Sequence, residues 1–341
     1  MRANERLQDL PEEIIFGRSE EMARLRIYVL RVAPTDAPIL ILGESGTGKE
    51  VIARALHAHS LRSSNAFVKV NCPAIPGTLL ESELFGYEQG AFTGAFEAKA
   101  GLVDLAENGT LFLDEIGDME QPLQAKLLQL LQDGAYLRIG GQEERHANLR
   151  IICATNRPLQ DAIESGAFRR DLFYRINVIT ITMPPLSRRR EDIPVLVRHF
   201  MKRYQLEYDT AVEDVSPALM RLFLQYNWPG NIRELENLVK RYVILGSAAT
   251  VANDLLGRGP TPPIDGNTSL KALTREAVRE LERKIILGVL YDNNWNRKRA
   301  AEILKISYRA LFYKIKDAGV PNKRRRLPKS AGQPGGDRPA V

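Results

Sequence analysis

The feature that most constrains the fold is a series of short apolar runs between residues 38 and 183, separated by segments with helical spacing. Such runs, rich in β-branched residues, are typical of strands buried on both faces, and the segments between them are typical of crossover helices. The sequence therefore predicts a parallel α/β sheet whose strands cover residues 39–42, 67–71, 110–114, 149–155 and 178–183.

The strand signals end after residue 186, and three amphipathic segments between residues 191 and 245 indicate helices. In the last of these segments the apolar residues share one face, namely Ile232, Leu235, Val239 and Tyr242. A run rich in Pro and Gly at 257–269 can neither pack nor hold a helix, so it predicts a linker. We expect a short N-terminal segment (1–13), an α/β part (14–186), a helical part (187–250), a flexible linker (251–270), an all-α domain (271–321) and a basic disordered tail (322–341).

The charge of the chain is unevenly distributed. Residues 271–327 hold 16 Lys and Arg against 6 Asp and Glu, so this segment carries +10, whereas the remaining 32 basic and 36 acidic residues give −4. A mildly acidic body with a strongly basic C-terminal piece is typical of a protein with a nucleic-acid-binding appendage. A basic helix pair that is merely solvated is the alternative.

Apolar length and cysteine usage bear on location. No apolar run approaches the ~20 residues that span a bilayer, and the N-terminus lacks the apolar core of a secretory signal. Cys72 and Cys153 each follow an apolar run, which is typical of buried thiols in a reducing compartment. We expect a cytoplasmic protein with no membrane partner.

The stretch GESGTGKE, residues 43–50, follows the first predicted strand and precedes a helical pattern. This is the context of a phosphate-binding loop, in which backbone N–H groups surround phosphate at the start of a helix. Gly43, Gly46 and Gly48 allow the loop to curl, and Lys49 adds a positive charge. Glu50 stands where such loops usually carry a Ser or Thr that helps to hold Mg²⁺. A glycine-rich turn without a ligand is the alternative.

Asp114 and Glu115 lie at the end of the third predicted strand. In open α/β sheets the ligand site lies at the carboxyl ends of the strands. An Asp there can hold Mg²⁺ through water, and an adjacent Glu can polarise the attacking water. Together with Lys49, the pair predicts an ATPase that uses ATP and Mg²⁺.

Several longer motifs resemble one branch of the AAA+ ATPases. They cover roughly residues 14–250 and are GESGTGKE, VNCPAIPGTLLESELFGYEQGAFTGA, GTLFLDEIGDM, CATN, FRRDLFYRINV, PPLSRRREDI and WPGNIRELEN. The set is similar to the central domain of bacterial enhancer-binding proteins, the activators of sigma-54 RNA polymerase. This resemblance implies an AAA+ P-loop parallel sheet with a helical lid subdomain. In this family a Glu at position 50 is normal, so Asp114, waters and the phosphates would hold the metal.

The resemblance also assigns roles to single residues that match the family's motifs. It implies that Asn71 is a switch that holds Glu115, that Asn156 senses the γ-phosphate, and that Arg233 is a lid arginine that contacts nucleotide. Asn156 could instead cap a turn.

Two further arginines, Arg169 and Arg175, match the family's arginine-finger region, which projects into the site of a neighbouring subunit. Arg170 makes the first assignment ambiguous, and Arg170 and Arg175 could instead pair with Asp171 on the surface. The expected catalytic residues are Asn71, Asp114, Glu115, Arg169 and Arg175. The expected ATP contacts are Gly43, Glu44, Ser45, Gly46, Thr47, Gly48, Lys49, Glu50, Asn156 and Arg233.

A loop of uncharged residues lies between the second and third predicted strands. In EQGAFTGAFE, residues 88–97, two glycines flank a Phe-Thr pair and permit changes of backbone conformation. A companion hairpin is expected over 136–150, with its turn at Gly140 and Gly141. The resemblance implies that sigma-54 is contacted by Gly90, Ala91, Phe92, Thr93, Gly94 and Ala95. A buried Gly-Ala turn packed under the sheet is the alternative.

Residues 293–320 predict two short helices with a break near Ile306 and Ser307. Ser307 is suited to cap the second helix and Gly319 to end it, while Ala300, Leu304, Leu311 and Ile315 form an apolar face. The pattern predicts a helix-turn-helix and resembles the Fis-type domain, and residues 273–290 predict a dimerising helix. We expect contacts to enhancer DNA from Ser307, Tyr308, Arg309, Tyr313 and Lys314.

Three classes of function fit parts of this sequence. They are an ATP-driven activator of sigma-54 RNA polymerase, an AAA+ replication initiator or protein remodeller, and a DNA-binding repressor with a decayed ATPase. The GAFTGA motif favours the first over the second, and the intact Lys49, Asp114, Glu115 and Asn156 argue against the third.

The resemblance also bears on assembly and control. It implies a homo-oligomer, from a dimer to a hexameric or heptameric ring. Only about a dozen residues precede the predicted ATPase. We therefore expect this chain to lack an N-terminal receiver or sensory domain, with control by a regulatory protein in trans or by an upstream segment that was removed.

Overall fold

The structure is a computed structural model that describes residues 11–74, 77–257, 286, 289–290, 296–304 and 306–317. The chain divides into two compact units, Met1–Gly259 and Pro260–Val341. The predicted linker after residue 257, most of the predicted helix over 273–290, Gly319 and the basic tail lie outside the described residues.

A five-stranded parallel sheet forms the centre of the first unit, as predicted. Its strand order is β2-β3-β6-β1-β7, with four parallel pairings. The bounds are Ile39–Leu42 (β1), Phe67–Asn71 (β2), Thr110–Asp114 (β3), Arg150–Thr155 (β6) and Ile179–Thr182 (β7). Because Asn71 is in register with Asp114, and Leu42 with Thr155, the polar residues at the carboxyl ends of these strands meet at one edge.

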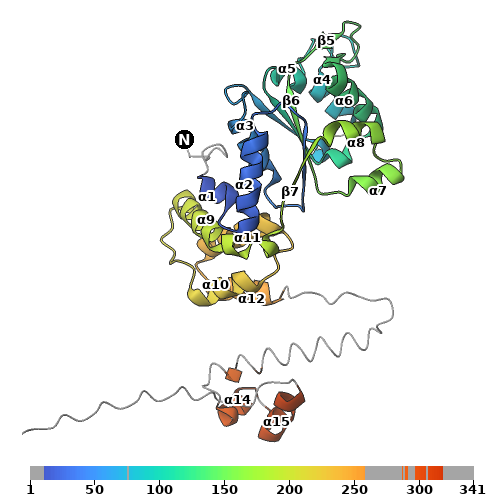
Figure 1. Ribbon diagram of the computed structural model, residues 1–341. Helices are drawn as coiled ribbons and strands as arrows, with labels where there is room; N and C mark the ends of the chain where they lie inside the picture. The colour runs from blue at the N-terminus through green and yellow to red at the C-terminus, as the bar shows by residue number, and fades with distance from the viewer. Residues whose placement is uncertain are drawn as a thin grey trace, which may run out of the picture. The chain divides into compact units, whose positions relative to one another are not determined.

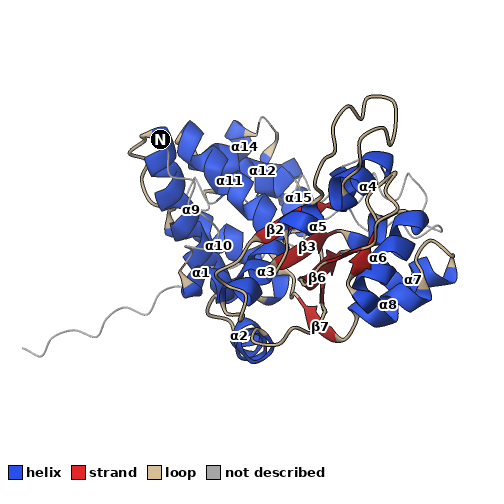
Figure 2. Cartoon of the chain, turned by 90° about the horizontal axis from the view of Figure 1, so that it is seen from above, coloured by secondary structure: helices blue, strands red, loops and turns tan. Residues whose placement is uncertain are grey.

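Helices cover both faces of this sheet (Figures 1 and 2). One face packs on α2 (Glu20–Val32) and α3 (Lys49–Ala58) through alternate strand residues such as Ile39, Ile41 and Ile152. The other face packs on helices that include α4 (Gly77–Phe85), α6 (Gln121–Asp133) and α8 (Arg170–Ile176) through residues such as Leu40 and Leu113. The remaining helices of this part are α1 (Glu12–Phe16), α5 (Leu102–Leu105) and α7 (Leu159–Glu164).

The expectation that every strand is buried on both faces is wrong for the two edge strands. Lys69 in β2 and Thr180 and Thr182 in β7 are exposed. Each edge strand has a neighbour on one side only, so the covering helices shield it incompletely. The thiols behave as predicted, since Cys72 and Cys153 are free and buried. Burial is the main cause that raises the pKa of Cys72 to about 12.

A helical subdomain follows the sheet. Its helices are α9 (Ile193–Tyr208), α10 (Pro217–Gln225), α11 (Asn231–Leu245) and α12 (Ala248–Gly257). They share one core, in which Leu235 and Val239 of α11 are completely buried, as the periodicity predicts. The predicted boundary at 250 is wrong, because Val251 and Leu255 of α12 belong to this core, so the first part of the expected linker is helix.

The predicted companion hairpin is present. Strands β4 (Ala135–Tyr136) and β5 (Arg145–His146) pair antiparallel, and the N–H of Gly141 donates to the carbonyl of Arg138 across the turn. Gly140 is the third residue of this four-residue turn, and its φ of 74° lies in the left-handed region that favours glycine.

In the second unit, α14 (Arg297–Ile303) and α15 (Tyr308–Asp317) form the two predicted helices. Ser307 accepts a hydrogen bond from the N–H of Ala310 at 3.1 Å, so it caps α15 as expected. Ala300, Leu311 and Ile315 are buried and Leu304 is partly buried, which confirms the predicted apolar face.

Candidate functional site

The loop between β1 and α3 has the conformation of a phosphate-binding loop. Gly46 and Gly48 have φ values of 78° and 98°, in the left-handed region that favours glycine. A Cβ atom on Gly46 would lie 2.5 Å from the carbonyl oxygen of Gly230 in the helical subdomain. Glycine is therefore required at position 46 by the backbone conformation and by close packing against the lid.

Three consecutive carbonyl groups of this loop accept hydrogen bonds from the lid side. The donors are Nδ2 of Asn231 to Ser45 (3.1 Å), N–H of Ile232 to Gly46 (2.9 Å) and Nη2 of Arg189 to Thr47 (2.5 Å). In a planar trans peptide the C=O and the following N–H point in opposite directions. The lid thus orients the loop so that the N–H groups of Gly46 and Gly48 point away from it, as an anion site requires.

We call these three donors, Asn231, Ile232 and Arg189, the clamp. Asn231 is its central residue and was missed by sequence reasoning. It is completely buried, at φ 52°, and its Oδ1 accepts from the N–H of Leu186 at 2.8 Å while Nδ2 also donates to Glu44 at 2.9 Å. Asn tolerates the left-handed region better than most residues. The signal in the sequence is the turn WPGN itself, in which Trp228 is also left-handed at φ 53°.

Arg189 was also missed, and its guanidinium is buried beside the loop. Besides Thr47 it contacts the sulfur of Met22 at 3.4 Å. Burial lowers the pKa of Arg189 to about 10. The adjacent turn is fixed as well, because Asp192 accepts from the N–H groups of Arg18 and Ser19. The segment 189–192 therefore joins the P-loop, the N-terminal helices and the lid.

Lys49 and Glu115 form the ionic centre of the site. The Nζ atom of Lys49 lies 3.1 Å from Oε1 of Glu115 and donates to the carbonyl of Gly43 at 2.9 Å. The N–H of Asn156 donates to the other oxygen of Glu115 at 2.8 Å. Glu115 has φ 53°, and a non-glycine residue in the left-handed region is strained by ~1–3 kcal/mol. Such strain next to a buried lysine is typical of a functional position.

The two predicted asparagines take different positions. Asn71 lies opposite Asp114 in register. Among the described residues, however, the carboxylate of Glu115 accepts hydrogen bonds from Lys49 and from the backbone N–H of Asn156. The expected link from Asn71 to Glu115 is therefore not formed in this conformation, because Glu115 turns toward Lys49. Asn156 reaches Glu115 through its backbone, and it is exposed.

Asp114 and Glu50 share one cation, Lys69, which sequence reasoning also missed. Nζ of Lys69 lies 2.6 Å from Oε2 of Glu50 and 3.4 Å from Oδ2 of Asp114. Arg54 holds the other oxygen of Glu50 at 2.9 Å. Glu50, Lys69 and Asp114 line one pocket together with the P-loop and Arg233. The described residues contain no group of three or more His, Cys, Asp or Glu that could hold a metal.

The three basic residues predicted from motifs divide into two groups. Arg233 lies at the P-loop, where its Nη1 donates to the hydroxyl of Ser45 at 2.8 Å. Arg169 pairs with Asp171 at 2.7 Å, and Arg175 donates to the carbonyl of Leu131 at 2.8 Å. The alternative in which Arg170 and Arg175 pair with Asp171 is not seen among the described contacts, where the partner of Asp171 is Arg169. These contacts do not bring Arg169 or Arg175 to Lys49 or Glu115 within one chain.

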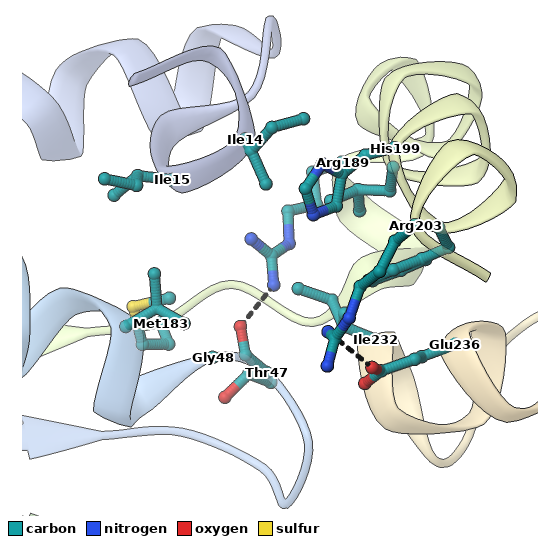
Figure 3. A pocket seen from close by; sticks show the side chains of 13 residues that line it. Ile14, Ile15, Thr47, Gly48, Met183, Arg189, His199, Arg203, Ile232 and Glu236 are labelled. Atoms are coloured by element: carbon teal, nitrogen blue, oxygen red, sulfur yellow. Dashed lines mark hydrogen bonds and ion pairs between the residues drawn. The ribbon is translucent and has the colours of Figure 1, made fainter. Parts of the chain in front are cut away.

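An apolar pocket adjoins the P-loop on the side of the N-terminal helix (Figure 3). Ile14 and Ile15 of α1, Met183 and Ile232 line it beside Gly48. Polar groups border it, including Arg189 and the ion pair of Arg203 with Glu236 at 3.3 Å. Sequence reasoning did not identify this pocket, because its apolar residues come from five segments that lie far apart in the sequence.

The GAFTGA loop is exposed rather than buried, so the alternative of a turn under the sheet is wrong. Phe92 and Thr93 are exposed and only Ala95 is buried. The loop is closed by its own backbone, since the N–H of Gly90 donates to Ala95 at 2.9 Å. Phe92 packs edge-on against Tyr87 with ring centroids 4.9 Å apart. The companion hairpin supports the base, where the N–H of Glu88 donates to the carbonyl of Ile139 at 3.0 Å.

In the second unit, the predicted DNA-contact residues Tyr308 and Arg309 are exposed and Lys314 is half-buried. The side chain of Tyr313 lies outside the described residues. In the described parts of both units, no helix is long and apolar enough to cross a membrane.

Comparison with family models divides the chain into three matches. Residues 15–182 match the sigma-54 interaction domain, residues 187–260 match the AAA+ ATPase lid domain, and residues 277–317 match the bacterial regulatory proteins of the Fis family.

Relatives of known sequence and structure match most of this chain. The chain is 46% identical over 301 residues to the regulatory protein AtoC of Escherichia coli, covering 85% of this chain and 64% of AtoC. It is 45% identical to the transcriptional regulatory protein ZraR of Klebsiella oxytoca, covering 88% of this chain and 68% of ZraR. NtrX from Brucella abortus, solved in complex with ATP, is 37% identical with a TM-score of 0.67, covering 89% of this chain and 69% of that one. The chain thus spans just under two thirds of the length of AtoC.

The three matched domains follow one another in the same order as the parallel P-loop sheet, its helical lid and the C-terminal helix pair. The chain therefore belongs to the family of sigma-54-dependent transcriptional activators, with an AAA+ ATPase-type domain, its lid and a Fis-type helix-turn-helix DNA-binding domain.

Proposed function

We propose that the chain is an ATP-hydrolysing activator that binds enhancer DNA and remodels closed complexes of sigma-54 RNA polymerase through its GAFTGA loop. The observation that carries this proposal is the cluster of Lys49, Asp114 and Glu115 beneath a P-loop in which the lid holds three consecutive carbonyls, those of Ser45, Gly46 and Thr47. In such a site the ammonium of Lys49 can bind phosphate, and the carboxylate of Glu115 can accept a proton from water.

ATP is the proposed substrate. The N–H groups of Gly46 and Gly48 and the ammonium group of Lys49 would hold the phosphates, Ser45 would contact them from the loop, and Arg233 would contact them from the lid side. The apolar pocket beside Gly48 has the character of a base site, since Ile14, Ile15 and Ile232 offer apolar area to a flat ring. NtrX, a relative with the same fold, has been solved with ATP and with ADP.

The donor set fits Mg²⁺. Mg²⁺ prefers oxygen ligands, keeps several waters and binds through one or two carboxylates plus substrate phosphates. Asp114 offers one carboxylate at the strand end, and Glu50 is engaged by Arg54 and Lys69, so Asp114 is the proposed protein ligand. The metal would neutralise charge on the β- and γ-phosphate oxygens.

Hydrolysis is proposed to depend on Glu115. Water attacks the γ-phosphorus, the carboxylate of Glu115 accepts its proton, and the bond to the bridging oxygen of ADP breaks. The backbone of Asn156 already orients Glu115. Asn71 at the end of β2 and the side chain of Asn156 after β6 are proposed to respond to the γ-phosphate from the two strands that flank β3.

Arg169 and Arg175 are proposed to act in a neighbouring subunit of a homo-oligomer, up to a hexameric or heptameric ring. Within one chain they lie away from Lys49 and Glu115, so a role at the γ-phosphate requires a second subunit. An arginine supplied in trans can raise the rate by ~10³-fold or more.

Partner contacts are proposed at two places, the GAFTGA loop and the α15 region. Phe92 and Thr93 offer sigma-54 an uncharged tip on a loop that the companion hairpin supports. Ser307, Tyr308, Arg309, Tyr313 and Lys314 of the α15 region are proposed to contact enhancer DNA in the major groove.

The test is Glu115→Gln in the purified full chain. Binding of a fluorescent ATP analogue should stay within about threefold of wild type, while ATP hydrolysis should fall at least ~100-fold because the proton acceptor is lost. Glu164→Gln, an exposed glutamate on α7, is the matched control and should hydrolyse ATP normally. Hydrolysis by Glu115→Gln at near the wild-type rate would show that the assignment of the base is wrong.

A further inference from the structure

Lys69 has an unusual position for a lysine on an edge strand. Its ammonium group lies between two carboxylates that come from different elements, Glu50 at the start of α3 and Asp114 at the end of β3. The side chain is about one-third exposed and lines the same pocket as Lys49 and the P-loop. Although its edge strand leaves Lys69 accessible to solvent, two ion pairs hold its ammonium group at the site, and these contacts call for an explanation in terms of the site.

Glu50, the first of these carboxylates, directly follows the P-loop lysine. In most P-loops the residue after the lysine gives a hydroxyl to the metal, and here it is Glu50. Arg54 and Lys69 occupy both of its oxygens, at 2.9 and 2.6 Å. Burial alone would raise the pKa of Glu50, but the hydrogen bonds and charges of Lys69 and Arg54 outweigh burial and lower it. Glu50 is thus an anion that is already neutralised by protein cations.

The second carboxylate is the proposed ligand of Mg²⁺. Oδ2 of Asp114 lies 3.4 Å from the same ammonium group, close enough for a direct ionic interaction. A cation bound at Asp114 would therefore be repelled by the ammonium of Lys69, and both positive charges would be attracted to the same carboxylate.

From this arrangement, and on the basis of the proposed function, we infer that Lys69 is a positioning residue that competes with Mg²⁺ for Asp114 and thereby sets how strongly nucleotide binding depends on the metal. Without metal, Lys69 balances the carboxylates that would otherwise repel the phosphates of ATP. With metal, the ammonium weakens the hold of Asp114 on Mg²⁺ and keeps Glu50 away from it.

The sign of the effect follows from the charges. Removing the ammonium leaves Glu50 and Asp114 with one cation fewer, so metal-free ATP should bind more weakly. The same change frees carboxylate oxygens for Mg²⁺, so ATP with Mg²⁺ should bind as well as before or better. The ratio of the two dissociation constants, without and with Mg²⁺, should therefore rise.

The experiment measures this ratio for Lys69→Met in the full chain. A fluorescent, non-hydrolysable ATP analogue is titrated in EDTA and again in excess MgCl₂. The ratio should rise about fivefold or more, the effect of one partly exposed ion pair at hydrogen-bonding distance. Lys69→Arg should restore it, and Lys126→Met, which removes a paired lysine on α6, should leave it at the wild-type value.

Two results would overturn the inference. A merely structural role would shift both dissociation constants by one factor and leave the ratio unchanged. A role in orienting Asp114 toward Mg²⁺ would lower the ratio. If the wild-type chain bound no ATP in either buffer, the proposed function would fail instead, so the two failures are distinguishable.

Discussion

Two glycines in the first unit have nearly the same backbone conformation in very different surroundings. Gly46 in the P-loop has φ 78° and Gly90 in the GAFTGA loop has φ 83°. A Cβ on Gly46 would lie 2.5 Å from the carbonyl oxygen of Gly230, whereas nothing lies within 4 Å of a Cβ on Gly90. The P-loop is shaped by contacts from the lid, and the tip of the GAFTGA loop by its own hydrogen bonds.

The comparison suggests a division of labour between the two regions. At the P-loop, hydrogen bonds from Asn231, Ile232 and Arg189 fix successive peptide groups, which suits a site where phosphate oxygens must meet N–H groups within tenths of an ångström. At the GAFTGA loop, exposed Phe92 and Thr93 stand on a supported base but remain uncovered. The first region is suited to holding phosphate in a fixed geometry, and the second is suited to contact with a partner protein.

The largest expected effect comes from Lys49→Ala. Because Lys49 supplies the charge at the centre of the P-loop, affinity for a fluorescent ATP analogue should fall at least ~100-fold. Binding of sigma-54 by the nucleotide-dependent route should disappear with it. A dissociation constant within tenfold of wild type would show that Lys49 does not grip phosphate.

Gly46→Ala and Gly90→Ala test the comparison itself. Both should lose about 1 kcal/mol because Ala is strained in the left-handed region. Gly46→Ala must also displace the carbonyl of Gly230, so we expect a further loss of about 2 kcal/mol and weaker nucleotide binding. Urea unfolding of the first unit measures both variants. Equal destabilisation would contradict the claim that the lid shapes only one of the two loops.

Asn231→Gly should weaken the lid contacts with a smaller loss of stability than Gly46→Ala, and Asn231→Ala with a loss of about the same size. Asn231→Gly keeps the left-handed backbone accessible and removes only the side chain, which leaves the N–H of Leu186 without its partner, at about 2 kcal/mol. Asn231→Ala should cost about 1 kcal/mol more because of backbone strain. Asn237→Ala, an exposed asparagine on the same helix, should change the free energy of unfolding by less than about 0.5 kcal/mol. An equal loss in the free energy of unfolding for all three variants would show that Asn231 has no special role in the clamp.

The sequence predicts the sheet, the three helices over 191–245 and the helix pair of the second unit because their signals are local. Apolar runs and helical spacing are visible within one segment, and Ser307 caps α15 through a residue three positions away. Periodicity does not reveal which strand lies at an edge, so the exposure of Lys69 and Thr180 was not predicted. Nor does the Pro- and Gly-rich run show that α12 precedes it with a buried face.

The candidate site was predicted as far as its motifs extend. Lys49, Asp114, Glu115 and Arg233 do meet at one edge of the sheet. Asn231, Arg189, Lys69 and Ile14 were missed because they reach the site from other segments, in the case of Asn231 and Glu44 across 187 residues. The contacts of Asn231, Arg189 and Ile14 depend on the docking of the lid and of α1, and those of Lys69 depend on the pairing of β2 with β3. The local turn WPGN indicates a special conformation at Asn231 but not the partners that it meets.

The central claim is that the P-loop site hydrolyses ATP while the GAFTGA loop couples hydrolysis to sigma-54, and Thr93→Ala tests it most directly. One preparation of the variant is assayed for ATP hydrolysis and for promoter opening by sigma-54 RNA polymerase. Because Thr93 is exposed and has no contact with Lys49 or Glu115, hydrolysis should stay within about twofold of wild type while promoter opening is lost. Normal promoter opening by Thr93→Ala, or hydrolysis that falls in parallel with it, would contradict the account.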